Sequence, residues 1–327
     1  LNDERGKTLI PVIEYTCDIV CHNTAKWRGE FSHLGITTSR FFDMDLSKQD
    51  RYAPEPRTQQ IAQMRGNMSQ RKVLVHYHIF KNAGTTFERV LDENYGDGHI
   101  KFDGPFSFSA ITQDQLGTII QRHPEAMACS SHQIHLPSPS AIQFKPIPVV
   151  FIRNPLLRIR SVFLFSERSG DGSPNKLTHP DPLTGLEEWV IKTLSGDKNL
   201  LQISNLQTGM LSRCYNLPPK REGVEGRVNF DLQLAINNLS VVPCLGRVEY
   251  FDIDVPSFTE TLARCDVPFA YEKREAENVS SPDYKDTVEE QLRTMERSLS
   301  PETWQKLHWL NHQDLALYEI AHEIVEK

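Results

Sequence analysis

Residues Val73–Tyr95 read VLVHYHIFKNAGTTFERVLDENY, the pattern of a strand, a short loop and a helix. The first seven residues are rich in β-branched and aromatic side chains, which favour an extended strand. Apolar residues then recur at positions 87, 90, 91 and 95, the spacing of one buried helix face. A loop that joins a strand directly to a helix N-terminus presents backbone N–H groups to an anion, most often a phosphate.

The loop holds a lysine, a glycine and two hydroxyl side chains, in the order Lys81-Asn82-Ala83-Gly84-Thr85-Thr86. Its lysine comes three residues before the glycine, whereas the lysine of a Walker A loop follows the glycine directly. The order therefore argues against an ATP or GTP site of the usual kind. The alternative is an ordinary strand–helix connection capped by Thr85 or Thr86.

Strands and helices continue to alternate along the chain. Further strands are expected at 126–130, 147–152 and 241–248, and further helices at 112–122, 156–165, 185–194, 199–210, 258–265, from residue 300, and at 313–325. The run 147–152 is apolar throughout, which is typical of a parallel strand buried on both faces. We predict an α/β, three-layer, P-loop-like fold with a central, mainly parallel sheet. Residues 71–327 form this domain, and residues 1–70 an N-terminal extension.

Composition narrows the function classes. A chain of 327 residues is long enough to bury a large core without the help of disulfides or a structural metal. Its net charge of −7 does not favour nucleic acid or an anionic membrane surface as a partner. No run of 18 apolar residues is present, so no membrane span is expected. The six cysteines are scattered, which favours free thiols and a cytoplasmic location. Cys17, Cys21 and His22 lack the second ligand pair of a zinc finger, so no metal is expected.

A second anion-binding motif follows the apolar run 147–152. Arg153 stands where that strand ends, at the usual ligand edge of a parallel sheet, and a guanidinium can take a phosphate or sulfate with two hydrogen bonds. Ser161 lies eight residues later, on the same helix face. Arg158 and Arg160 add positive charge. Taken alone, this segment is also compatible with a solvated basic helix face.

Together the two motifs resemble the sulfotransferases that use 3′-phosphoadenosine 5′-phosphosulfate (PAPS) as donor. The second motif of that family commonly reads Arg-Asp-Pro-x-x-Arg-x-x-Ser, and residues 153–161 (RNPLLRIRS) match it at Arg, Pro, Arg and Ser. Asn154 replaces the Asp, and Phe80 stands where a proline often precedes the lysine. The match covers 74–166, is weak beyond residue 200 and absent before residue 70. It implies that the Lys81–Thr86 loop holds the 5′-phosphosulfate and that Arg153 and Ser161 hold the 3′-phosphate, with Arg158 as a further cofactor-binding residue.

Within that family the chain looks most like the carbohydrate branch, the uronyl 2-O-sulfotransferases in particular. His132, 21 residues before Arg153, matches their general base, with His135 as the second candidate and His78 as a possible acceptor contact. The resemblance implies a saccharide acceptor, PAP as product, no required metal, and Lys81 as the group that stabilises the leaving phosphate.

Two other functions remain open from the sequence. One is a kinase-like P-loop phosphotransferase, and the other is a non-catalytic relative that binds a nucleotide. The scattered cysteines favour a cytoplasmic location. The family resemblance implies an alternative, the Golgi lumen, with a membrane anchor that is missing from this sequence. The sequence does not indicate the acceptor's identity or the oligomeric state.

Overall fold

The computed structural model describes residues 8–9, 70–105, 109–169, 181–195, 200–212, 220–222, 227–273 and 286–327. The chain divides into two compact units, residues 1–11 with 70–327, and residues 12–69. The second unit lies outside the described residues, and with it the Cys17, Cys21 and His22 group. Of residues 169–184, whose Gly, Pro, Asp and Ser content predicts a surface loop, the stretch 170–180 lies outside the described residues as well.

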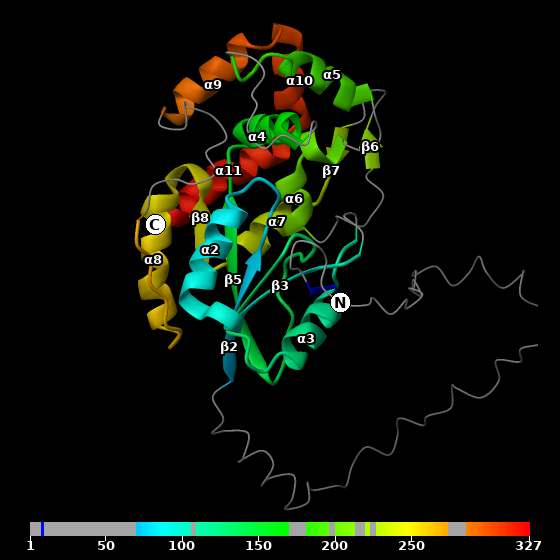
Figure 1. The fold of residues 1–327 in the computed structure, drawn as a ribbon. Helices are drawn as coiled ribbons and strands as arrows, with labels where there is room; N and C mark the ends of the chain where they lie inside the picture. Colours follow the sequence, from blue (N-terminus) through cyan, green and yellow to red (C-terminus); the bar gives the residue numbers. More distant parts are fainter. Residues whose placement is uncertain are drawn as a thin grey trace, which may run out of the picture. The chain divides into compact units, whose positions relative to one another are not determined.

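Five parallel strands form the central sheet in the order β3-β4-β2-β5-β8, and a two-residue strand, β1, extends its edge (Figure 1). The strands are β1 Thr8–Leu9, β2 Arg71–Tyr77, β3 His99–Asp103, β4 Ala128–Ser131, β5 Phe144–Ile152 and β8 Cys244–Arg247. β2 lies between β4 and β5, so the strands that follow β2 in the chain are placed on both sides of it. The crevice beyond the carboxyl ends of such strands is where α/β proteins bind ligands.

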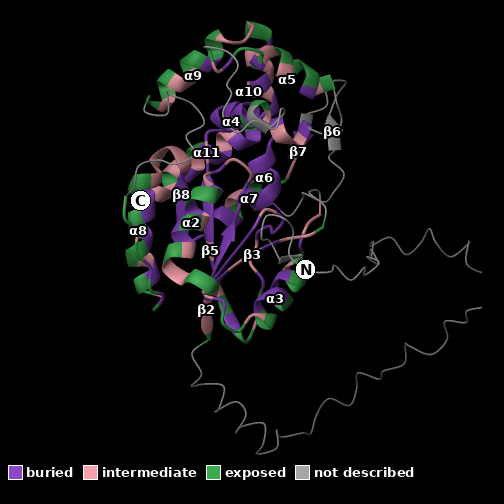
Figure 2. Ribbon diagram, in the orientation of Figure 1, coloured by how far each residue is buried: buried purple, intermediate pink, exposed green. Residues whose placement is uncertain are grey.

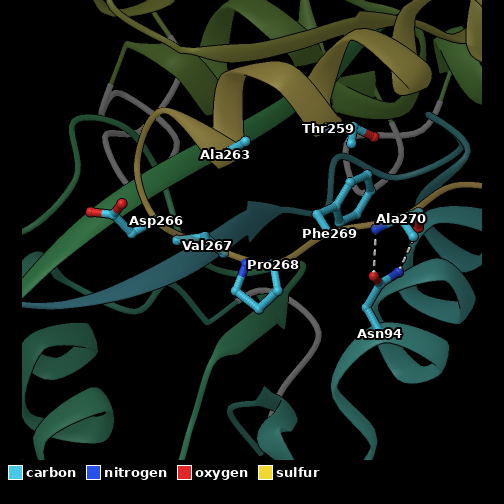
Figure 3. A pocket seen from close by; sticks show the side chains of 8 residues that line it. All are labelled: Asn94, Thr259, Ala263, Asp266, Val267, Pro268, Phe269 and Ala270. Atoms are coloured by element: carbon cyan, nitrogen blue, oxygen red, sulfur yellow. Dashed lines mark hydrogen bonds between the residues drawn. The ribbon is translucent and has the colours of Figure 1, made fainter.

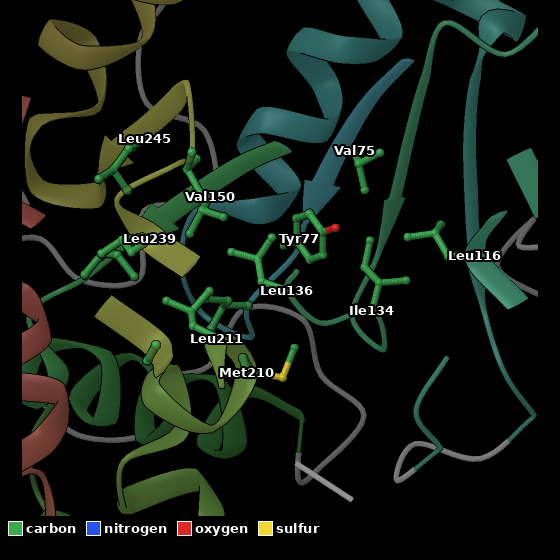
Figure 4. Packing of buried hydrophobic residues seen from close by; sticks show 14 of the residues in the cluster. Val75, Tyr77, Leu116, Ile134, Leu136, Val150, Met210, Leu211, Leu239 and Leu245 are labelled. Atoms are coloured by element: carbon green, nitrogen blue, oxygen red, sulfur yellow. The ribbon is translucent and has the colours of Figure 1, made fainter. Parts of the chain in front are cut away.

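Helices cover both faces of the sheet, which confirms the predicted fold class. On one face lie α2 Gly84–Tyr95 and α8 Phe251–Ala263, packed on apolar residues of β2, β5 and β8. The other face is covered by α3 Gln113–Arg122, α6 Leu206–Leu211, α7 Leu232–Leu239 and α11 His312–Val325. Figure 4 shows Tyr77 at the centre of that second cluster, and Figure 2 shows the buried strands between the two layers.

A further group of helices packs at the end of the sheet where β5 leads into α4 (Figure 1). It consists of α4 Pro155–Ser169, α5 Leu186–Ser195, η3 Leu200–Ile203, α9 Val288–Arg297 and α10 Pro301–Leu310. The remaining elements are η2 Gly96–Gly98, η5 Val248–Tyr250 and a two-stranded antiparallel sheet of β6 Lys220–Glu222 and β7 Arg227–Asn229. None of the described helices is long and apolar enough to cross a membrane.

The single helix expected at 199–210 is interrupted. Asn205 has a φ of 45°, and its side chain donates to the carbonyl of Val228 at 2.7 Å and accepts from the backbone of Gln313 at 3.1 Å. Asparagine tolerates the left-handed region, and its amide here satisfies backbone groups of other elements. The break therefore has a tertiary cause that periodicity does not reveal. α8 in turn begins seven residues before the expected 258, because it continues through Pro256.

Candidate functional site

The loop between β2 and α2 passes twice through the left-handed region. Lys81 and Ala83 have φ angles of 67° and 56°, which most residues avoid. Between them, the buried Asn82 donates through Nδ2 to the carbonyl of Phe151 and to Oε1 of Gln207, both at 2.7 Å. These bonds fasten the loop to β5 and α6 and keep its unusual backbone in one shape.

The first turn of α2 has no side-chain cap. Ala83 occupies the N-cap position, and no side chain accepts a bond from the helix start within the described residues. Thr85 and Thr86, the caps of the alternative reading, are both exposed. Uncapped amides and the helix dipole attract an anion. The start of α2 therefore fits the phosphosulfate end of the expected site.

The imidazole ring of His78 lies directly against Gly84, the first residue of α2. A Cβ atom on Gly84 would lie only 1.8 Å from Cδ2 of that ring, so a larger residue requires the ring to move. Nδ1 of His78 and Oε1 of Glu88 are 2.8 Å apart. Burial alone would raise the pKa of Glu88, but its hydrogen bond with His78 and the neighbouring positive charges lower it overall. An ionised carboxylate thus holds His78 at the start of α2.

His132 directly follows β4, and its ring stacks on that of His78. The ring centroids are 3.8 Å apart and the planes differ by 30°. Nδ1 of His132 is 3.1 Å from Oδ2 of Asp103, and its backbone N–H donates to Oδ1 of the same carboxylate at 2.9 Å. The side chain remains 32 % exposed. His132 therefore combines a carboxylate partner, a stacked neighbour and access for a ligand.

His135, the second candidate for the base, is buried. It is 6 % exposed, and burial lowers its pKa to about 4. A group with this pKa is a weak acceptor for a hydroxyl proton at neutral pH, because the best general bases have a pKa near the working pH. The structure therefore favours His132 over His135 for the catalytic role.

The same pKa makes a prediction about stability. The ordinary histidine pKa of about 6.5 applies to unfolded His135, so the unfolded state gains a proton first as the pH falls. We expect the free energy of unfolding to decline from about pH 6.5 to about pH 4, by roughly 3 kcal/mol from this group. Urea unfolding of wild type and His135→Gln at pH 7 and pH 4.5 measures the effect, which the variant should lack. A parallel decline in both proteins would contradict it.

The lysine and the arginine of the two motifs meet at the loop. Nζ of Lys81 lies 4.6 Å from the ring centroid of Phe165, which is 47 % exposed on α4 and makes an edge contact with Phe80 at 5.7 Å. The carbonyl of Lys81 accepts a bond from Nη1 of Arg153 at 2.9 Å. Two basic groups and an aromatic pair thus border the start of α2.

Arg153 also has an acidic neighbour. Its Nε lies 3.6 Å from Oε1 of Glu249, and its backbone N–H and carbonyl both bond to the side chain of Gln207 at 2.9 Å. Burial lowers the pKa of Arg153 and raises that of Glu249, and each group partly offsets the burial of the other. Removing one charge would leave the other buried, which is costly.

The other predicted contacts of the second motif are buried on α4. Ser161 is 3 % exposed. Arg158 is fully buried and donates to the carbonyl of Gln202 in η3 at 2.6 Å, and Arg160 donates to Gln291 in α9 at 3.1 Å. These two arginines therefore tie α4 to neighbouring helices. The bond to Gln202 shows a structural role for Arg158, and its assignment as a cofactor contact stays a prediction.

One trio among the described residues has the composition of a metal site. The ligand atoms of His76, His78 and Glu88 lie within 4.8 Å of one another. The two imidazole planes, however, differ by only 19° at a centroid separation of 5.3 Å, so their in-plane lone pairs do not converge on one point. Nδ1 of His76 is also 3.1 Å from the hydroxyl of Ser130. The trio is arranged as a packed polar network, which fits a metal poorly.

A pocket of about 590 Å³ lies elsewhere, between the last turn of α2, α8 and the segment after α8 (Figure 3). Asn94 closes one side of it through two bonds with the backbone of Ala270, at 2.7 and 2.8 Å. Asn94 is ten residues beyond Gly84, which corresponds to about 15 Å along a helix. The pocket is thus separated from the His132 site by the length of α2 and supplies none of its groups.

Two carboxylates of the site were not predicted from the sequence. Asp103 ends β3, and β3 pairs with β4 in a register that sets Lys101 opposite Ser130, so that the two strand ends bring Asp103 to His132. Glu88 lies one helical turn after Gly84, on the side of α2 that meets His78. The first contact depends on strand pairing. The second follows from helix spacing once His78 is assigned to the strand end.

Comparison with known proteins gives one distant relative and no family. No protein-family description matches the chain. An uncharacterized protein of Archaeoglobus fulgidus is 26 % identical over 259 residues, which cover 76 % of this chain and 95 % of the archaeal protein. This similarity extends over most of both chains but carries no function with it.

Proposed function

We propose that the protein is a sulfotransferase that transfers a sulfuryl group from PAPS to a hydroxyl of a saccharide. The observation that carries the proposal is the contact chain from His132 through His78 to Gly84. His132 stacks on His78, and His78 lies against the first residue of an uncapped helix. A candidate base and an anion-binding helix start are thus joined at the carboxyl edge of a parallel sheet, where the reaction needs both.

Each residue has a defined task in this proposal. PAPS supplies the sulfuryl group and a phosphate leaving group. His132 accepts the proton of the attacking hydroxyl, which is otherwise a poor nucleophile. Lys81 and the first-turn amides of α2 stabilise the charge that develops on the departing phosphate oxygen. Arg153 and Ser161 bind the 3′-phosphate, and because Ser161 is almost covered, its neighbours must move to admit this contact.

The saccharide acceptor rests on the resemblance of His132 and its spacing to the uronyl branch of the family. A hydroxyl acceptor is consistent with the site, because a base is needed only when the nucleophile must lose a proton. The kinase alternative lacks comparable support. Arg153 follows the last residue of strand β5, where a kinase-like site is expected to place an acidic residue for magnesium.

Nucleotide binding tests the proposal directly. We expect PAP without magnesium to raise the melting temperature on the order of 5 °C at a hundredfold excess over its Kd, since a bound ligand stabilises the folded state. Mg-ATP should raise the melting temperature much less. AMP, which lacks the 3′-phosphate, should give a rise between those of PAP and Mg-ATP. Differential scanning fluorimetry gives all three values. Equal shifts for PAP and Mg-ATP would favour the kinase reading.

Arg153→Ala should weaken PAP binding by 10- to 150-fold, because it removes a charge-assisted contact worth about 1.5–3 kcal/mol. The variant also leaves Glu249 without its partner, so stability and binding must be separated. The double variant Arg153→Ala/Glu249→Gln removes the buried charge and should recover stability but not affinity. Isothermal titration with PAP and urea unfolding measure the two effects. Unchanged PAP affinity in the single variant would remove Arg153 from the site.

A further inference from the structure

The carboxylate of Asp103 makes three contacts with the segment that carries His132. Oδ1 accepts from the backbone N–H of His132 at 2.9 Å and from the hydroxyl of Ser131 at 2.9 Å, while Oδ2 faces Nδ1 of the His132 ring at 3.1 Å. One side chain therefore binds both the backbone and the ring of the same histidine. Such an arrangement fixes the ring direction as well as the position of the residue.

We propose that Asp103 is a positioning residue that holds His132 with its proton on Nδ1 and its lone pair on Nε2. An ionised carboxylate only accepts hydrogen bonds, so the ring nitrogen that faces it must carry the hydrogen. Neutral imidazole has one such hydrogen, which leaves Nε2 as the basic nitrogen. The catalytic consequence of this inference rests on the proposed function. The position of the proton on Nδ1 follows from the contact with Asp103 alone.

The rest of the site keeps the ring in that orientation. His78 supports one face of the His132 ring at 3.8 Å, and His78 is itself held between Gly84 and Glu88. Because the plane of the His132 ring and its Nδ1 are both constrained, a rotation of this ring would break the hydrogen bond between Nδ1 and Asp103. The orientation of Nε2 of His132 is then fixed, and because the side chain is partly exposed, an incoming hydroxyl can reach it.

The transfer step balances with these groups. The acceptor oxygen forms the new O–S bond while its proton moves to Nε2 of His132. The S–O bond to the 5′-phosphate breaks, and its electron pair stays on the phosphate oxygen of PAP. Asp103 remains ionised throughout and stabilises the imidazolium that His132 becomes, as a buried aspartate does in other histidine–aspartate pairs.

Asp103→Asn is the informative variant. The backbone N–H of His132 can only donate, so it keeps the amide oxygen of the new asparagine on its side and turns the NH₂ group toward Nδ1. Nδ1 must then accept, and the hydrogen moves to Nε2. We expect kcat for sulfuryl transfer to fall about 10²- to 10⁴-fold, with PAP affinity within threefold of wild type.

Nitrogen-15 NMR of histidine-labelled protein reads the proton position without any turnover. At a pH where the His132 ring is neutral, wild type should show a protonated Nδ1, and Asp103→Asn a protonated Nε2. Asp92→Asn is the control, because Oδ1 of Asp92 faces Nδ1 of a different histidine, His99, at 2.7 Å, while its Oδ2 pairs with Lys101. It should leave the His132 signals and kcat unchanged.

The outcomes separate the inference from the function. A wild-type His132 with its hydrogen on Nε2, or an Asp103→Asn variant with a shifted hydrogen and normal kcat, overturns the role of Asp103. Loss of PAP affinity together with kcat would show a purely structural role and overturn it as well. If wild type has the expected proton position and binds PAP but transfers sulfate to no saccharide, the proposed reaction fails while the placement of the proton stands.

Discussion

His132→Ala should abolish sulfuryl transfer and leave PAP binding nearly intact. We propose this partly exposed, carboxylate-supported side chain as the base, and general base catalysis contributes about 10²- to 10⁴-fold to a rate. The loop is fastened by bonds from Asn82 to Phe151 and Gln207 and from Arg153 to Lys81, none of which involves His132, so the anion site should survive. Single-turnover transfer from labelled PAPS to a saccharide panel, with titration calorimetry of PAP, measures both quantities.

Two further variants make the result specific. His123→Ala removes a partly exposed histidine that pairs with Glu125 outside the site, and it should behave as wild type. His135→Ala tests the second candidate and should retain transfer despite some loss of stability. Transfer that persists in His132→Ala and disappears in His135→Ala would reverse the assignment. PAP binding without transfer by wild type would favour the non-catalytic relative.

The sequence predicted those parts of the molecule that depend on local pattern. The β2–loop–α2 unit has a strand period, a helix period and a loop between them, so its elements were expected close to their observed bounds. Fold class followed from the alternation of such units. Asp103 is different, because its contact with His132 depends on the pairing of β3 with β4. Registers of this kind arise between segments that are far apart in sequence, and one chain gives no signal for them.

Arg158 and Gly84 show the limits of motif reading at single residues. The second motif assigned Arg158 to a ligand, and the structure adds a bond from this fully buried side chain to the carbonyl of Gln202 that the motif did not indicate. The first motif included Gly84 as part of an anion-binding loop. In the structure, the space that a side chain on Gly84 would fill is occupied by the imidazole ring of His78.

Gly84→Ala should therefore be strongly disruptive, although it is a glycine-to-alanine change at a helix start. Its Cβ would lie 1.8 Å from Cδ2 and 1.9 Å from Nε2 of His78, far inside van der Waals contact. Overpacking of this kind costs about 1–3 kcal/mol. Because the new methyl group lies at the start of α2, where the proposed phosphosulfate binds, we expect PAP affinity to fall at least tenfold. The displaced ring would also move the surface on which His132 stacks, so transfer should be lost. Urea unfolding and PAP titration measure the two losses.

Gly117→Ala is the matched control. Gly117 is a buried glycine within α3, and a Cβ there would meet only Pro139, at an ordinary 3.8 Å. Because alanine is the better helix former, this variant should be more stable by about 0.5–1 kcal/mol. Two chemically identical substitutions thus have opposite expected signs, and the difference is due to a single neighbouring ring.

A double variant shows whether His78 is that neighbour. Removing the ring with His78→Ala leaves room for the new methyl group, so Gly84→Ala should cost far less in the His78→Ala background than in wild type. Contacting residues show such coupling, whereas independent sites add. A loss of stability that is the same in both backgrounds would mean that the methyl group conflicts with the loop backbone. The link from the anion site through His78 to His132 would then have to be abandoned.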